Sequence, residues 1–196
     1  MTKMYYDENP DSVHDIHELK VTLLNTNFTF YTDSGVFSKK NIDFGSQVLL
    51  RNLHFKKDET LLDLGCGYGP LGISLAKGQG VKATLVDINN RALDLARKNA
   101  EKNKVDLTIF QSNVYEQVSG NFDHIISNPP IRAGKKVVHE IIEKSIDFLN
   151  KDGDLTIVIQ KKQGAPSAKK KMALVFGNVT VIAKEKGYCI LRSIKE

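Results

Sequence analysis

The chain has 196 residues, 41% of them hydrophobic, and a formal net charge of +5 at pH 7. This length allows one well-cored α/β domain with a small appendage and excludes two full enzyme domains. No apolar run is long enough to span a bilayer, and the first residues lack the features of a signal peptide, so we predict a cytoplasmic protein without a membrane partner.

Metal chemistry is not indicated by the residue types. Cys66 and Cys189 form neither a disulfide framework nor a metal-ligand pattern. Five acids and histidines near the N-terminus could be drawn as metal ligands: Asp11, His14, Asp15, His17 and Glu18. No matching ligand set occurs elsewhere in the chain, so we interpret them as an acidic terminus and expect no bound metal.

The first elements predicted along the chain are a β-hairpin and a short helix. Polar and apolar residues alternate over 18–23 and return over 28–31 after a turn at 25–27, as expected for two paired strands. A short helix is predicted over 44–53, with Asp43 near its N-terminus. We therefore assign residues 1–55 to an N-terminal extension and residues 56–196 to the main domain.

From residue 60 onward, strands and helices alternate. Apolar runs predict strands at 60–64, 81–86, 107–110, 122–127 and 155–159. Helical spacing predicts helices from Pro70 toward Gly80, from an Asn90 cap to about Lys102, and over 138–149. Two last strands, 178–183 and 188–192, are joined closely enough to form a hairpin. The pattern predicts a Rossmann-like α/β fold: a seven-stranded, mostly parallel sheet with a C-terminal antiparallel hairpin and helices on both faces.

A glycine-rich loop follows the first strand of this repeated pattern. It reads Asp63-x-Gly65-x-Gly67-x-Gly69 and is followed by Pro70, where the nicotinamide fingerprint requires glycine. The loop also lacks the lysine and serine of a phosphate-binding P-loop. An NAD-dependent oxidoreductase is therefore the least favoured enzyme class.

The same loop resembles that of the class I methyltransferases, which bind S-adenosylmethionine. The resemblance implies that the loop holds the methionine end of the cofactor and that Asp63 binds its amino group. It also assigns the ribose hydroxyls to Asp87, about 20 residues beyond the loop, and the adenine amine to Asn113, whose position is often Asp in relatives. The predicted cofactor-binding residues are Phe37, Asp63, Gly65, Cys66, Gly67, Gly69, Asp87, Ile88, Asn113, Val114 and Asn128.

The predicted catalytic motif is Asn128-Pro129-Pro130, directly after the fourth strand. At the topological switch of the sheet, this turn would lie next to the glycine loop. The motif resembles the Asn-Pro-Pro-aromatic tetrapeptide of methyltransferases that modify adenine N6, guanine N2 or glutamine amides. The resemblance implies that the Asn128 side-chain oxygen and the Pro129 carbonyl accept the two N–H bonds of the target amine. Catalysis would then depend on positioning and would need no strong base.

Ile131 departs from that motif, because many relatives have an aromatic residue there. Phe37 or Tyr31 would then provide the stacking face. The stretches 34–38 and 42–46, together with the two motifs, resemble the small-domain (MTS) methyltransferases related to bacterial 16S ribosomal RNA guanine-N2 methyltransferases. The resemblance runs from about Glu18 to the C-terminus. Some relatives carry a preceding duplicated domain that this sequence lacks, so the target nucleotide stays open.

Basic residues gather near the predicted ligand edge, and no acid occurs from Leu155 to Ala183. This asymmetry indicates an edge that faces a polyanion. The resemblance implies that the polyanion is RNA, with an unpaired or flipped base as target. A solvated lysine-rich loop explains the segment equally well when it is taken alone. The predicted substrate-binding residues are Ile131, Arg132, Lys135, Lys161, Lys162, Lys169, Lys170 and Lys171.

The sequence as a whole predicts an S-adenosylmethionine-dependent methyltransferase acting on guanine N2 of 16S ribosomal RNA, with a monomer favoured and the oligomeric state left open. Adenine N6 and glutamine in a protein are alternative acceptors. A non-catalytic RNA-binding module is an alternative from another class, although the intact glycine loop, Asp87 and Asn-Pro-Pro motif argue against it.

Overall fold

The computed structural model describes residues 15–34, 36, 41–130 and 134–196. Its main sheet has the strand order β5-β4-β3-β6-β7-β9-β8. The first five of these strands run parallel, and β9 and β8 are antiparallel to their neighbours. The strands are β3 (Thr60–Leu64), β4 (Lys82–Asp87), β5 (Thr108–Gln111), β6 (Phe122–Ser127), β7 (Leu149–Gln160), β8 (Thr180–Glu185) and β9 (Tyr188–Ile194). The predicted Rossmann-like sheet with its antiparallel hairpin is confirmed.

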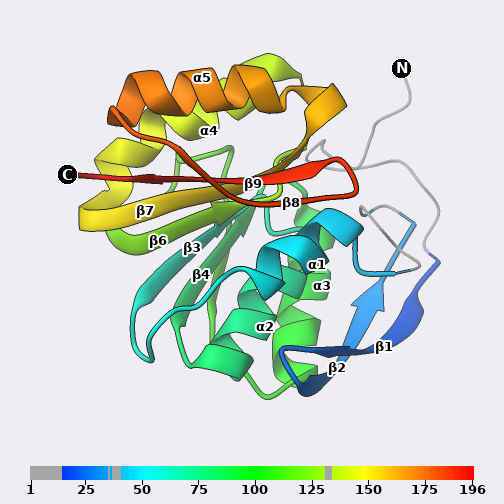
Figure 1. The fold of residues 1–196 in the computed structure, drawn as a ribbon. Helices are drawn as coiled ribbons and strands as arrows, with labels where there is room; N and C mark the ends of the chain where they lie inside the picture. The colour runs from blue at the N-terminus through cyan, green and yellow to red at the C-terminus, as the bar shows by residue number, and fades with distance from the viewer. Residues whose placement is uncertain (1–14, 35, 37–40, 131–133) are drawn as a thin grey trace.

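Helices cover both faces of the sheet (Figure 1). On one face lie α1 (Phe44–Arg51), α2 (Pro70–Gln79) and α3 (Asn90–Lys102), and on the other lie α4 (Lys135–Ser145) and α5 (Ala165–Phe176). Each face has its own hydrophobic cluster. The predicted N-terminal hairpin is also present as β1 (His17–Leu23) and β2 (Thr26–Thr32), outside the main sheet. Two short 3-10 helices, η2 (Ile146–Phe148) and η3 (Lys161–Gln163), flank β7.

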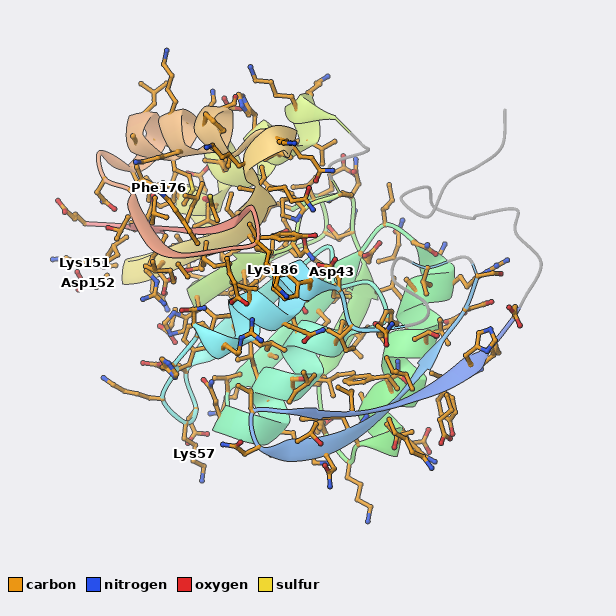
Figure 2. The ribbon with its side chains drawn as sticks, turned by 45° about the vertical axis from the view of Figure 1, so that its right-hand side comes forward. Asp43, Lys57, Lys151, Asp152, Phe176 and Lys186 are labelled. Carbon is orange, nitrogen blue, oxygen red and sulfur yellow. The ribbon has the colours of Figure 1, made fainter. Side chains whose placement is uncertain are left out.

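Helix α5 was not predicted, because glycine, proline and a run of lysines gave its segment the composition of a loop. Gly164 and Gly177 instead flank the helix with positive φ angles, and proline occupies its first turn. Ala168, Met172 and Phe176 recur every four residues and are buried against the sheet. Figure 2 labels Phe176 at the C-terminal end of this helix.

Two predicted helix boundaries were also wrong. Asn89, and not Asn90, caps α3, because the extended backbone at Asn89 lets its side chain accept a hydrogen bond from the amide of Ala92. Helix α4 ends at Ser145 rather than at Leu149. Leu149 belongs to β7, because it pairs with the start of β6.

The N-terminal hairpin is attached to α3 by two asparagines one turn apart. Asn99 accepts a hydrogen bond from the Tyr31 amide (2.6 Å) and donates to the Tyr31 carbonyl (3.0 Å). Asn103 makes the equivalent pair with Thr29 (3.1 and 2.8 Å). The two carboxamides thus pair with the backbone N–H and C=O groups on the outer edge of β2, as a neighbouring strand would. Asn99 also donates to the carbonyl of Tyr68 (2.9 Å), which ties the hairpin to the glycine loop.

We expect Asn99→Ala to lower the free energy of unfolding by roughly 1–3 kcal/mol, because it removes the side-chain hydrogen bonds to the backbone of Tyr31 and Tyr68. Urea unfolding followed by circular dichroism would measure this. Lys98→Ala, at an exposed position of the same helix, is the matched control and should change little. Equal stabilities of the two variants would contradict this role of Asn99.

A histidine lies between two carboxylates near the amino end of β6. The Nδ1 atom of His124 is 2.5 Å from Asp154 Oδ1, and its Nε2 atom is 3.0 Å from Glu59 Oε2. The ring also stacks on Phe55 at 3.9 Å between centroids. Burial acts to lower the pKa of His124, but the hydrogen bonds and charges of Asp154 and Glu59 outweigh it and raise the pKa above its usual value.

This raised pKa makes stability depend on pH with a definite sign. Protonated His124 stabilises the fold fully below the unfolded-state pKa of about 6.5, and this contribution is lost as pH rises through the folded-state pKa. Urea unfolding across a pH series should therefore show wild type losing stability relative to His124→Gln as pH rises. His139→Gln is a control with the opposite trend, because burial and nearby lysines lower the pKa of His139. Wild type should gain stability relative to this variant as pH rises. A pH-independent difference between wild type and His124→Gln would contradict the prediction.

Candidate functional site

A cavity of about 550 Å³ opens at the carboxyl ends of the parallel strands. This is the edge where open α/β sheets bind ligands. The loops after β3, β4, β5 and β6 form one side of the cavity, and the end of β7, the start of α1 and the start of β9 form the other. From the predicted cofactor set, the cavity is lined by Gly65, Cys66, Gly67, Asp87, Ile88, Asn113, Val114 and Asn128, joined by Pro129 and Pro130 of the predicted catalytic motif.

The glycine loop turns its backbone toward the cavity. Gly65, Gly67 and Gly69 have φ angles of +74°, +57° and +90°, which side-chain-bearing residues rarely adopt. A Cβ atom at Gly65 or Gly67 would meet no atom of the described chain within 4 Å, so the backbone there is open to a ligand. Gly69 does not line the cavity. It precedes α2, where a Cβ atom would come within 2.7 Å of Ile73.

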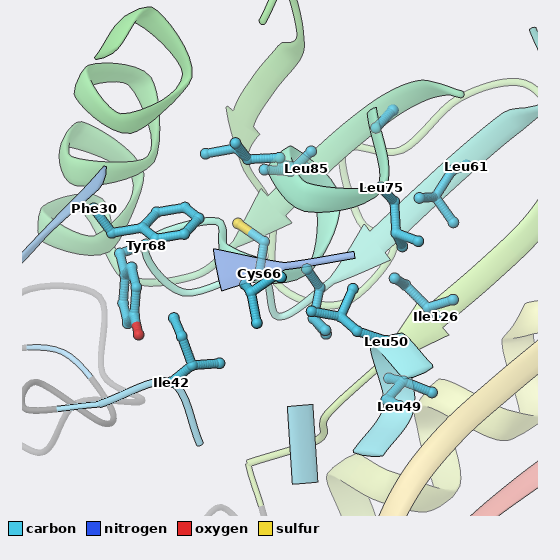
Figure 3. Close-up of a cluster of buried hydrophobic side chains, with 14 of the residues drawn as sticks. Phe30, Ile42, Leu49, Leu50, Leu61, Cys66, Tyr68, Leu75, Leu85 and Ile126 are labelled. Atoms are coloured by element: carbon cyan, nitrogen blue, oxygen red, sulfur yellow. The ribbon is translucent and has the colours of Figure 1, made fainter. Parts of the chain in front are cut away.

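The side chains within this loop pack into the core. Cys66 and Tyr68 are both buried, and Figure 3 shows them among Phe30, Ile42 and the leucines of α1. The rings of Phe30 and Tyr68 meet edge to face at 6.0 Å between centroids. This packing holds the loop from behind, so the open backbone positions keep their shape.

Two acids lie at the glycine loop, the buried Asp63 and the half-buried Asp87, and they have different surroundings. Asp87 lines the cavity, and its carboxylate accepts hydrogen bonds from the amides of Gly67 (2.8 Å) and Asn89 (2.9 Å). Burial raises the pKa of Asp87, while these hydrogen bonds act to lower it. Asp63 lies behind the loop and off the cavity wall, where it accepts from the amide of Gly72 (2.9 Å).

Of the two acids, Asp63 has the less favourable surroundings for a negative charge. Its Oδ1 atom is buried and has no hydrogen-bond partner among the described residues. Burial, with a smaller contribution from the charge of Asp87, raises the pKa of Asp63 to about 7 against the effect of the Gly72 amide. A positively charged group in front of the loop would stabilise the ionised Asp63 carboxylate, so the acid pair suits a cationic ligand.

Asn128 has its two amide ends in different environments. Its Nδ2 atom donates to Asp43 Oδ2 and to Ser46 Oγ, both at 2.9 Å. Its Oδ1 atom has no hydrogen-bond partner in the part of the chain that the structure describes. Since Asn128 lines the cavity, this side chain offers an acceptor to whatever lies there.

The loop after β5 carries the predicted adenine-binding residues. Asn113 donates from Nδ2 to Glu116 (2.9 Å), and its amide oxygen has no partner within the described part of the chain. Val114 has a φ angle of +53°, a strained value for a β-branched residue, and its carbonyl accepts from Ser112 Oγ. Such strain is characteristic of segments held in place for a ligand.

None of the predicted substrate-binding lysines lines the cavity. Lys161 and Lys162 are exposed on η3, between Gln160 and Gln163, which do line it. Lys135 borders a small second cavity, to which Gln163 also contributes.

The lysines of α5 differ from one another. Lys169 and Lys170 are exposed, whereas Lys171 forms an ion pair with Glu143 of α4. The predicted residues Phe37, Ile131 and Arg132 lie outside the described residues.

Several cavity residues were not predicted. Asp43 and Ser46 have the spacing of a helix cap, and that spacing gave no sign of their contact with Asn128. Tyr188 of β9 forms an aromatic wall of the cavity. Tyr31, which the sequence suggested for this role, belongs to β2 and does not line the cavity. Across the residues that the structure describes, no group of three metal-ligating side chains was found. No helix among them is long and apolar enough to cross a membrane.

Comparison with known proteins places most of the chain in one protein family. The family model of the methyltransferase small domain matches residues 27–192. The protein YbxB of Bacillus subtilis is 46% identical over the whole length of both chains. Ribosomal RNA small subunit methyltransferase C of Aeromonas hydrophila is 41% identical over 68% of this chain. The chain spans only 40% of the length of that relative.

A solved structure also resembles this fold. The 16S rRNA N2 methyltransferase (RsmC) of T. thermophilus, in complex with AdoMet and guanosine, superposes with a TM-score of 0.86. The superposition covers 95% of this chain and 52% of that one, at 24% sequence identity. The likeness establishes a shared fold.

Proposed function

We propose a function from one premise: the chain belongs to the methyltransferase small domain family. The function is transfer of a methyl group from S-adenosylmethionine to the exocyclic amine of a base, guanine N2 in 16S ribosomal RNA. One observation carries the proposal. Asn128 lines a cavity that it shares with an open glycine loop, and its amide oxygen has no hydrogen-bond partner among the described residues.

The cavity residues fit S-adenosylmethionine. The open backbone at Gly65 and Gly67 would hold its methionine end. Behind that loop lies the Asp63 oxygen that has no partner in the described ranges, so a cationic group is favoured there. Asp87 would bind the ribose hydroxyls, and the free amide oxygen of Asn113 would accept from the adenine amine. When bound, this cofactor supplies a methyl group on a positively charged sulfur. The T. thermophilus relative was solved with AdoMet, which supports the assignment.

The Asn-Pro-Pro turn would hold the acceptor. A base amine is a poor nucleophile because its lone pair is delocalised into the ring. Asn128 Oδ1 and the Pro129 carbonyl would each accept one N–H, which turns the lone pair toward the methyl group. The bound cofactor would supply the methyl group to this lone pair, and the methylated nitrogen would release its extra proton to water. Positioning is the main catalytic contribution in this scheme.

The acceptor side of the cavity is suited to a planar base. Tyr188 provides an aromatic wall on which a base would stack, a contact worth roughly 1–3 kcal/mol. Guanosine bound by the T. thermophilus relative supports guanine, and the names of the relatives support ribosomal RNA. Exposed lysines on η3 and α5 would neutralise phosphates around an extruded nucleotide.

The central test measures methyl transfer to ribosomal RNA that lacks the modification. Wild type should yield N2-methylguanosine, and Asn128→Ala should lower kcat about 10²-fold, the effect of losing one transition-state contact. Affinity for S-adenosylmethionine, measured by calorimetry, should fall far less than kcat, because the glycine loop, Asp87 and Asn113 would still hold the cofactor.

The outcomes separate the alternatives. Label on adenine or on a protein glutamine would replace the guanine assignment while keeping the chemistry. Cofactor binding without label on RNA or on assembled subunits would overturn the ribosomal substrate.

RNA contact by α5 can be tested with a control on the same helix. Replacing Lys169 and Lys170 by alanine should reduce the slope of log K against log salt by roughly 1–2, because each phosphate contact contributes about 0.7–0.9. Lys171→Ala should reduce it less, since Lys171 is already paired with Glu143. Fluorescence anisotropy with a labelled ribosomal RNA fragment provides the measurement. An unchanged slope in the double variant would show that α5 does not contact RNA.

A further inference from the structure

We infer that Asp43 and Ser46 act as an orientation clamp, a pair of acceptors that fixes the Asn128 carboxamide with its oxygen toward the cavity. The inference rests on the proposed function and deepens it, because the orientation of that amide decides which acceptor atoms can be methylated. Asp43 and Ser46 are thus positioning residues, and neither needs to touch the substrate.

A carboxamide needs such a clamp because its two ends have nearly the same shape. Rotation by 180° about its last bond exchanges an acceptor oxygen for a donor NH₂ group. With the oxygen in the cavity, Asn128 attracts an N–H bond of the substrate. With the nitrogen there, it would repel that N–H and compete for the lone pair that must form the new bond.

The two clamp residues favour one orientation strongly. Both Nδ2 hydrogens of Asn128 have acceptors, Asp43 Oδ2 and Ser46 Oγ, each at 2.9 Å. A carboxylate can only accept hydrogen bonds, so a rotated amide would place its oxygen against the Asp43 oxygen. The Ser46 hydroxyl could adapt to either orientation by turning its proton. Asp43 therefore decides the orientation, and Ser46 satisfies the second hydrogen.

The clamp itself is held by the start of α1. Asp43 caps this helix, and the same Oδ2 atom that faces Asn128 accepts from the Ser46 amide (3.1 Å). Gly45 lets the ring of Tyr188 lie directly against this turn, since a Cβ atom there would come within 2.7 Å of Tyr188 Cε1 and 2.9 Å of Asp43 Oδ2. Figure 2 labels Asp43 at the beginning of α1. Helix capping and ring packing thus immobilise the carboxylate before any ligand binds.

A specificity follows from this geometry. The fixed oxygen admits acceptor atoms that carry N–H bonds, such as an exocyclic amine or a carboxamide. It opposes ring nitrogens that offer only a lone pair, because two acceptors would then face each other. The clamp therefore selects the chemical class of the acceptor, while other residues of the cavity distinguish one base from another.

The decisive variant is Asp43→Ser. Serine caps helices as well as aspartate does, so α1 should keep its stability, but its shorter side chain cannot reach Asn128. We expect an unchanged melting temperature and a side-chain amide of Asn128 that exchanges with solvent about tenfold faster in ¹⁵N NMR. Assignment of the Asn128 signal follows from its absence in Asn128→Ala. This readout needs neither cofactor nor RNA.

Kinetics with RNA give a second readout. Asp43→Ser should lower kcat by about 10–100-fold through misplacement of the acceptor, while KM for RNA and affinity for S-adenosylmethionine stay within about threefold. The double variant Asp43→Asn with Asn128→Asp exchanges the two side chains, so that an amide again faces a carboxylate. Its kcat should be about tenfold higher than that of Asn128→Asp alone.

Three results would overturn the clamp. These are an unchanged amide exchange rate in Asp43→Ser, a kcat that falls only in parallel with the melting temperature, and an exchanged pair no better than Asn128→Asp. If wild type methylates no RNA, the proposed function fails, but the NMR measurement still decides whether Asp43 holds Asn128.

Discussion

The hydrogen bond from Ser127 Oγ to the Leu64 carbonyl (2.7 Å) joins the two strand ends on which the site depends. Leu64 is the last residue of β3 and Ser127 the last of β6, and the two strands pair in parallel. The glycine loop begins directly after Leu64, and the Asn-Pro-Pro turn begins directly after Ser127. The strand order changes direction between β3 and β6: the chain continues to β4 on one side of this pair and to β7 on the other. The loops after β3 and β6 therefore separate, and the cavity opens between the cofactor side and the acceptor side.

Electrostatics divide that cavity into two halves. On the glycine-loop side, Asp63 is buried behind the loop and Asp87 lines the cavity, and both carboxylates accept hydrogen bonds from backbone amides. On the acceptor side, the Asp43 carboxylate accepts hydrogen bonds from the Asn128 side chain and from the Ser46 amide at the start of α1. A cation is favoured in the first half and an N–H donor in the second, which is the arrangement that methyl transfer from a sulfonium to an amine requires.

Local chemistry determined which parts of this arrangement could be predicted. Gly65 and Gly67 are needed for backbone angles that the loop itself requires, and Asn128 belongs to a contiguous motif, so the sequence alone indicated both. Helix α5 was missed because its buried stripe of Ala168, Met172 and Phe176 is diluted by lysines. The contact of Asp43 with Asn128 spans 85 residues, and no local pattern reveals which distant side chain a helix cap will also meet.

The two ends of the fold meet at the acceptor side. The N-terminal α1 and the C-terminal β9 contact each other through Phe44 and Tyr188, whose rings lie 5.7 Å apart, and through Gly45. Both segments lie outside the β3–β6 core that carries the glycine loop. Changes in α1 or in the β8–β9 hairpin can therefore alter the acceptor pocket without disturbing the loop that faces the cofactor. The packing of Tyr188 on Gly45 couples those changes, because a shift of either segment moves the carboxylate that orients Asn128.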